Sequence, residues 1–261
     1  MDASKSLHSM HSYFLRAGKE TQDIIYTVMA LSDGNSFSTR TVIASQGGKK
    51  IFVLVASFHK QCITQFSHQS AIPQVPPPES LRSDGDYFLS LVNDPRCPGK
   101  FVKHIKARAQ VKDQNPIDVR PVLVHDVFDG IPFPSGYAPP HEYPKFSNSA
   151  RQLVWMKSRL PLPDDENIHR SVLGYASDLG LLGTAKGNRP FFDISMVATL
   201  DHSMWFHASF RMDEWMLYEM ESPRLISERG LSFGKIFRRD GTLAVTVSQE
   251  GLIRLRDDAK L

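Results

Sequence analysis

The sequence predicts an α+β protein in which one strand-rich unit is used twice. Three observations lead to this prediction: strand-like segments crowd both ends of the 261-residue chain, one amphipathic helix lies between them, and the two ends resemble each other. A sheet with one apolar face needs a helix to cover it, and units of this kind commonly pair edge to edge. We therefore expect two such units, joined through their edge strands.

The composition of the chain excludes several classes of protein. Hydrophobic residues make up 41% and charged residues 23%, which is the profile of a globular protein and not of a disordered one. No window approaches the roughly 18 uninterrupted apolar residues of a membrane-spanning helix. Residues 1–15 mix charged and polar side chains where a signal peptide needs an apolar centre. We therefore expect neither a membrane span nor secretion.

Charge and cysteine content narrow the range of partners. Basic residues exceed acidic residues by only three, 31 against 28, which gives no sign of a nucleic-acid partner. Cys62 and Cys97 lie far apart, in neither a metal-binding nor a redox spacing. We expect no nucleic acid, no disulfide, no metal site and no cofactor.

Prolines and apolar patterning divide the chain into segments. Thirteen of the 17 prolines fall between Pro73 and Pro144, so we interpret this stretch as a long, partly ordered connector. Strands dominate on both sides of it. They are predicted over residues 23–30, 37–45 and 51–58 before the connector, and over 153–157, 197–206, 215–221, 231–238 and 242–249 after it.

One helix is predicted over residues 163–183. Pro163 and an acidic first turn begin it, apolar residues recur at steps of three and four, and Gly183 ends the pattern. Tyr175 lies in the apolar stripe, and Asp178 projects about 60° from it because each residue turns the helix by about 100°. Asp178 is therefore expected at the edge of the buried face.

The two ends of the chain are similar in sequence. Residues 6–14 match residues 199–207, and further matches follow at an offset of roughly 190 residues, which indicates one four-strand meander used twice. In the second copy, residues 151–198 precede the matching point and contain a strand and the helix. The first copy has only residues 1–5 there, so we expect the first unit to lack its opening strand and helix.

Five motifs stand out from this background. They are LHSMHSYF at residues 7–14, DGNSFS at 33–38, LGYASD at 173–178, LDHSMWFH at 200–207 and QEG at 249–251. Together they resemble the acyl-CoA thioesterase II family, including its peroxisomal members. The resemblance implies hydrolysis of acyl-CoA to a free fatty acid and coenzyme A.

The resemblance also implies the fold and the domain boundaries. The fold class is α+β, a double hot-dog in which two antiparallel sheets each wrap a helix, with the first hot-dog incomplete at its N-terminus. We expect an N-terminal hot-dog over residues 1–70, a proline-rich connector over 71–148 and a C-terminal hot-dog over 149–258. We expect residues 259–261 to form a peroxisomal targeting tripeptide.

Three residues match the catalytic positions of the family: Asp178 in the LGYASD motif, Thr199 just before LDHSMWFH, and Gln249 of QEG. Hydrolysis of a thioester needs no covalent intermediate when a base relieves a positioned water of its proton. We expect Asp178 to be this base, with Thr199 and Gln249 orienting the water. Taken singly, each residue also suits an ordinary surface or strand position.

Two other functions remain open from the sequence. A non-catalytic acyl-CoA-binding or assembly subunit would follow if the missing N-terminal segment prevented formation of an acyl site. A hot-dog enoyl-CoA hydratase is disfavoured, because it usually needs a histidine near its helix aspartate. The nearest helix histidine, His169, is nine residues before Asp178.

Two further patterns have structural explanations. Asp201, His202 and His207 suggest an acid-base or metal cluster, but Asp201 and His202 point to opposite faces of a strand, so we favour structural hydrogen bonds. Residues 230–234 match Gly-x-Ser-x-Gly of serine hydrolases. A nucleophile elbow needs a helix after its serine, whereas a strand is predicted to continue here.

The chain ends in Ala259, Lys260 and Leu261, which resemble the Ser-Lys-Leu peroxisomal address that a receptor reads. We therefore expect localisation in the peroxisomal matrix and recognition by the peroxisomal import receptor. The other expected partners are the acyl-CoA substrate and further copies of the chain in a homo-oligomer.

Overall fold

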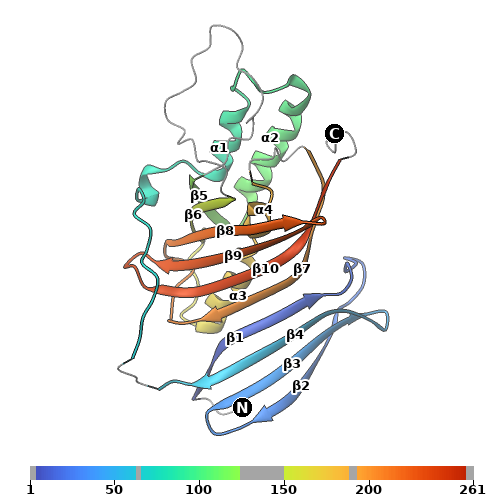
Figure 1. Ribbon diagram of the computed structural model, residues 1–261, viewed down its shortest axis with the longest axis vertical. Helices are drawn as coiled ribbons and strands as arrows, with labels where there is room; N and C mark the ends of the chain where they lie inside the picture. The colour runs from blue at the N-terminus through green and yellow to red at the C-terminus, as the bar shows by residue number, and fades with distance from the viewer. Residues whose placement is uncertain (1–3, 63–65, 124–149, 188–192, 257–261) are drawn as a thin grey trace.

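A computed structural model of the protein describes residues 4–62, 66–123, 150–187 and 193–256. Within these ranges, ten strands form one antiparallel sheet in the order β2-β3-β4-β1-β7-β10-β9-β8-β6-β5 (Figure 1). Their bounds are Lys5–Phe14 (β1), Ile25–Asp33 (β2), Phe37–Gln46 (β3), Lys49–Lys60 (β4), Ile117–Leu123 (β5), Arg151–Ser158 (β6), Ile194–Phe206 (β7), Met216–Ile226 (β8), Arg229–Arg238 (β9) and Leu243–Leu255 (β10).

The predicted duplication is visible in the order of the strands. The first unit runs β2-β3-β4-β1 and the second runs β8-β9-β10-β7, so each meander has the same internal arrangement. The two units join where β1 pairs with β7, the strands that carry the similar motifs. Met10 pairs directly with Met204, its equivalent in the repeat, so an approximate two-fold axis passes near this point.

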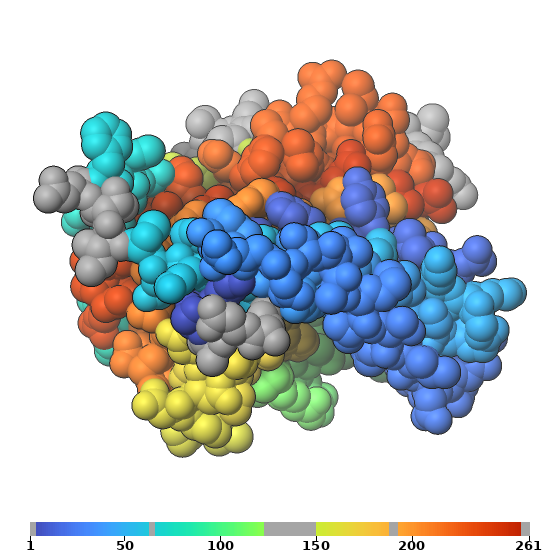
Figure 2. Space-filling view, turned by 90° about the horizontal axis from the view of Figure 1, so that it is seen from below, coloured from blue at the N-terminus to red at the C-terminus, as the bar shows by residue number. Residues whose placement is uncertain are grey.

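The first unit has four strands and no helix between Ser4 and Cys62. Strand β2 forms the free edge of the sheet, and all nine of its residues are exposed. Figure 2 shows the blue atoms of this unit spread over the end of the molecule viewed there. The equivalent strand of the second unit, β8, does not lie at an edge, because it pairs with β6.

The proline-rich connector contains more regular structure than its composition indicates. A short 3-10 turn, η1 (Pro78–Ser80), precedes helices α1 (Asp84–Leu91) and α2 (Gly99–Gln114). The two helices pack together through the buried Leu91 and Ile105. Strand β5 then adds to β6, so this part of the connector extends the second unit.

Helix α3 (Glu166–Ala176) lies against the sheet of the second unit (Figure 1). Asp165 caps its start by accepting a hydrogen bond from the backbone N–H of Asn167. Leu173 and Ala176 are fully buried in the main core, which also contains Met204. Burying these apolar side chains is what holds the helix to the sheet.

The prediction of one helix over residues 163–183 is wrong in its start, its end and its continuity, since α3 begins only at Glu166. The helix ends at Ala176, and a separate turn of helix, α4 (Leu181–Thr184), follows. Gly180 adopts a left-handed conformation with φ of 88°, which breaks the helix and which glycine adopts without strain. Asp178 consequently lies in the turn between the helices. Tyr175, expected in the apolar stripe, is 51% exposed. The buried face of α3 consists of His169, Leu173 and Ala176.

Among the described residues, no helix is both long and apolar enough to cross a membrane.

Candidate active site

The structure brings together the three residues that the sequence singles out. Asp178 comes from the turn after α3, Thr199 from β7 and Gln249 from β10. The Gln249 amide nitrogen donates to Asp178 Oδ1 at 2.6 Å and to Thr199 Oγ1 at 2.7 Å. The Thr199 hydroxyl donates to Asp178 Oδ1 at a longer 3.5 Å. Gln249 is fully buried and Asp178 is exposed, so the cluster has one face in the protein and one toward solvent.

An irregularity in β7 turns Thr199 into this cluster. His202 lies opposite Gln249 and Asp201 opposite Glu250, but Gly251 lies opposite Thr199, so Leu200 is an extra residue without a partner. In a regular strand, residues three apart point to opposite faces. The bulge at Leu200 therefore places Thr199 on the face that carries His202 and Gln249.

A buried layer fixes the turn that carries Asp178. The hydroxyl of Tyr218 on β8 donates to the carbonyl oxygen of Ser177 at 2.8 Å, and the Ser177 hydroxyl lies 2.9 Å from His202 Nε2. Burial raises the pKa of Tyr218 well above its ordinary value, so its hydroxyl stays protonated and donates. The residue before Asp178 is thus held from two strands.

The environment of His202 favours its neutral form. Burial lowers the pKa of His202, outweighing the opposite effects of the Asp178 charge, the adjacent Gln249 side chain and the Asp201 charge. A neutral imidazole has one donor nitrogen and one acceptor nitrogen, and its neighbours decide which is which.

The other histidine-rich features form separate hydrogen bonds. His207 Nε2 lies 2.7 Å from the Thr246 hydroxyl. Asp201 accepts from the backbone N–H of Glu250 at 3.1 Å, on the opposite face of β7 from His202. In the part of the chain that the structure describes, no three His, Cys, Asp or Glu residues lie close enough to hold a metal ion.

The Gly-x-Ser-x-Gly segment is part of a continuous strand. Ser232 lies within β9, paired with Gln249 of β10, and is fully buried. A strand that runs on through the serine provides no nucleophile elbow. The prediction that a strand continues through this serine is confirmed.

The comparisons with known proteins follow the same division of the chain. The family model for the acyl-CoA thioesterase N-terminal domain matches residues 2–59, and the acyl-CoA thioesterase model matches residues 141–252. Acyl-coenzyme A thioesterase 8 of Mus musculus is 37% identical over 252 residues, covering 96% of this chain and 73% of the relative. The chain belongs to the acyl-CoA thioesterase II family.

Other members of the family extend the likeness. The crystal structure of an acyl-CoA thioesterase II from Mycobacterium marinum is 35% identical, with a TM-score of 0.70, covering 99% of this chain and 84% of that one. Peroxisomal acyl-coenzyme A thioester hydrolase 1 of Saccharomyces cerevisiae is 25% identical over 275 residues, covering 94% of this chain and 78% of the relative. The predicted double hot-dog fold is confirmed.

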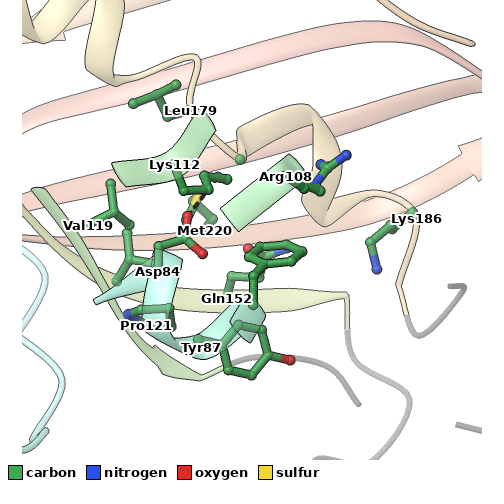
Figure 3. A pocket seen from close by; sticks show the side chains of 14 residues that line it. Asp84, Tyr87, Arg108, Lys112, Val119, Pro121, Gln152, Leu179, Lys186 and Met220 are labelled. Carbon is green, nitrogen blue, oxygen red and sulfur yellow. Dashed lines mark ion pairs between the residues drawn. The ribbon is translucent and has the colours of Figure 1, made fainter. Parts of the chain in front are cut away.

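In this thioesterase-family chain, a pocket opens beside the turn that carries Asp178 (Figure 3). One wall is apolar, and Arg108 and Lys186 stand at one side of it. Burial and then the charge of Arg108 lower the pKa of Lys186 to about 8. The sequence does not predict this pocket, because half of its lining comes from the connector. The lining residues are Asp84, Tyr87, Phe88, Arg108, Lys112, Val119, Pro121, Gln152, Val154, Leu179, Gly180, Gly183, Lys186 and Met220.

The basic residues that follow α3 in sequence are largely engaged with acidic neighbours. Arg239 lies 2.7 Å from Glu79, Arg238 lies 2.6 Å from Asp240, and Arg229 lies 3.6 Å from Glu250. These are mostly exposed pairs, each of which contributes little to stability. Arg238 and Arg239 line one pocket together with Arg211, which is itself paired with Asp213.

Proposed function

We propose that this chain hydrolyses acyl-CoA thioesters to a carboxylic acid and coenzyme A. The observation that carries the proposal is the convergence of a carboxylate, a hydroxyl and a carboxamide from three distant segments. Relatives named as acyl-CoA thioesterases, one from a mammal and one from a bacterium, support the same substrate class.

In the proposed mechanism, Asp178 acts as a general base toward a water molecule. The exposed side of its carboxylate can receive a water while the buried side accepts the Gln249 amide. The Thr199 hydroxyl, 2.7 Å from the same amide, provides a second polar contact for the water. Gln249 therefore fixes the base and the hydroxyl relative to each other, which reduces the entropy lost in reaching the transition state.

The proposed hydrolysis forms no covalent bond between the enzyme and the acyl group. The water oxygen bonds to the thioester carbonyl carbon while Asp178 accepts one proton. The tetrahedral intermediate then breaks its carbon–sulfur bond. Coenzyme A leaves as a thiolate, the proton passes from Asp178 to the sulfur, and the acid is released.

A direct assay separates this function from the non-catalytic alternative. The purified full chain, supplied with a fatty acyl-CoA, should release free thiol at a rate proportional to enzyme concentration. Binding of coenzyme A without thiol release would reject hydrolysis and support the binding subunit. The complete set of three residues in the second unit favours catalysis, and no observation favours the alternative.

We also propose that the chain acts in the peroxisome. The proposal rests on the C-terminal sequence Ala259, Lys260 and Leu261, which lies outside the described residues, and on the yeast relative, which is named as a peroxisomal thioester hydrolase. A fusion with a fluorescent protein at the N-terminus, which leaves residues 259–261 at the free C-terminus, should accumulate in peroxisomes. Removal of the last three residues should abolish this pattern, and unchanged peroxisomal signal would contradict the proposal.

A further inference from the structure

His202 is a buried histidine that the proposed mechanism leaves without a role. It lies on β7 directly opposite Gln249 on β10, and only 6% of its surface is exposed. Side chains of directly opposed residues share one face of the sheet, with Cβ atoms about 5 Å apart. His202 therefore adjoins the carboxamide that contacts both Asp178 and Thr199.

The hydrogen bonds of His202 and Gln249 leave one possible donor on the histidine and one acceptor on the glutamine unpaired. His202 Nε2 is paired with the Ser177 hydroxyl at 2.9 Å, and the Gln249 nitrogen directs its hydrogen bonds to Asp178 and Thr199. Nδ1 of His202 and Oε1 of Gln249 are both buried, and neither has a hydrogen-bond partner among the described residues. Since buried polar groups require partners, a ring N–H facing a carbonyl oxygen satisfies both atoms.

The contact at Nε2, on the other side of the His202 ring, is compatible with Nδ1 acting as the donor. The Ser177 hydroxyl lies 2.9 Å from His202 Nε2 and 3.2 Å from the carbonyl oxygen of Gly174. Donation to the nearer acceptor, Nε2, leaves the single proton of a neutral imidazole on Nδ1. The orientation of the Gln249 amide then follows. If the amide were reversed, its oxygen would face the Asp178 carboxylate, and its nitrogen would face the Nδ1 donor. Both contacts would be repulsive.

We infer that His202 is a positioning residue, whose Nδ1–H holds the Gln249 carbonyl so that the amide N–H groups point at Asp178 and Thr199. The inference rests on the proposed hydrolysis. His202 itself touches neither substrate nor water in this role. It acts by disfavouring the reversed orientation of the Gln249 amide, in which the oxygen and the nitrogen exchange places.

Two substitutions at this position separate positioning from packing. His202→Phe keeps a ring but loses both nitrogen contacts, and it should lower kcat about 10- to 100-fold while KM changes less than about twofold. His202→Asn places an amide N–H near the Nδ1 position and should restore kcat to within about threefold of wild type, although its smaller side chain leaves a cavity. A purely structural role predicts the reverse order, with Asn the more damaged variant in both melting temperature and kcat.

A double-mutant cycle tests whether the effect passes through Gln249. In a Gln249→Ala background, His202→Phe should change kcat less than about twofold, because the group that it orients is gone. A loss as large as in the wild-type background would overturn the inference. His11→Phe is the matched control, since His11 also bonds to a serine hydroxyl, Ser203 at 3.0 Å, but lies on β1. It should retain kcat within about twofold.

The ring of His202 can also be observed without an activity assay. Nitrogen-15 NMR of the wild-type chain should show a neutral imidazole with its proton on Nδ1. A neutral ring with its proton on Nε2 would contradict the inference whatever the chain hydrolyses. If wild type releases no thiol yet shows the Nδ1 proton, the proposed function fails while the hydrogen bond stands.

Discussion

Asp178→Asn should lower kcat on a fatty acyl-CoA by about 100- to 10,000-fold. The substitution preserves the shape of the side chain but removes the basic oxygen that would take a proton from water. Because Asp178 lies exposed in a turn, the fold should not depend on its charge. The melting temperature of the variant should therefore stay close to that of wild type.

The neighbouring carboxylate provides the control for this result. Asp201 lies on the opposite face of β7 and accepts a backbone hydrogen bond from Glu250. Asp201→Asn should retain kcat within about threefold, since an amide oxygen can accept the same hydrogen bond. Equal losses in the two variants would indicate a general electrostatic effect, and an unchanged rate in Asp178→Asn would remove Asp178 from the mechanism.

Gly251→Ala should destabilise the chain by about 1–3 kcal/mol and lower kcat as well. An added Cβ at Gly251 would lie 2.7 Å from the carbonyl oxygen of Ala198 and would also meet the side chain of Leu182. Leu182 can adjust, but the backbone at Ala198 can move only by shifting Thr199. We expect a melting temperature about 3–10 °C lower, measured by thermal denaturation, and a kcat about tenfold lower.

A glycine without close neighbours serves as the control for that prediction. Gly99 begins α2, and a Cβ built on it would meet nothing within 4 Å. Gly99→Ala should leave kcat unchanged and the melting temperature equal or slightly higher. A Gly251→Ala variant as stable and as active as Gly99→Ala would show that the bulge tolerates displacement and that Thr199 does not depend on it.

The sequence predicts the repeat and the three site residues because both leave direct marks on it. Similar motifs at residues 6–14 and 199–207 identify the two strands that pair at the centre of the sheet. The strand positions follow from alternation of apolar residues, since one face of the sheet must be buried. The site residues come from the family resemblance, and the structure adds the hydrogen bonds that join them.

The bulge that aims Thr199 is less visible in sequence. Leu200 is an ordinary strand residue, and period-two alternation alone would place Thr199 on the face away from Gln249. Gly251 was the available signal, since glycine inside a strand often marks a bulge or a close backbone approach. The break after Ala176 is similar, because the apolar spacing of residues 168–182 continues through the left-handed Gly180.

The helices of the proline-rich connector are not predicted from the sequence for a different reason. Proline at the start of a helix is compatible with helical structure, and Pro98 immediately precedes α2. The residues of α2 are mostly polar, so apolar periodicity gives a weak signal for it. Its few buried residues, including Ile105, are positioned by contacts with α1 that no local pattern reveals.

Oxygen labelling in a single turnover tests most directly whether Asp178 activates water. With the wild-type chain in excess over a fatty acyl-CoA in water enriched in oxygen-18, each released fatty acid should carry one heavy oxygen. Attack by the Asp178 carboxylate itself would form an anhydride. Its hydrolysis at the aspartyl carbon would give unlabelled fatty acid in that first turnover. Unlabelled product would therefore contradict the proposed role of Asp178 as a base.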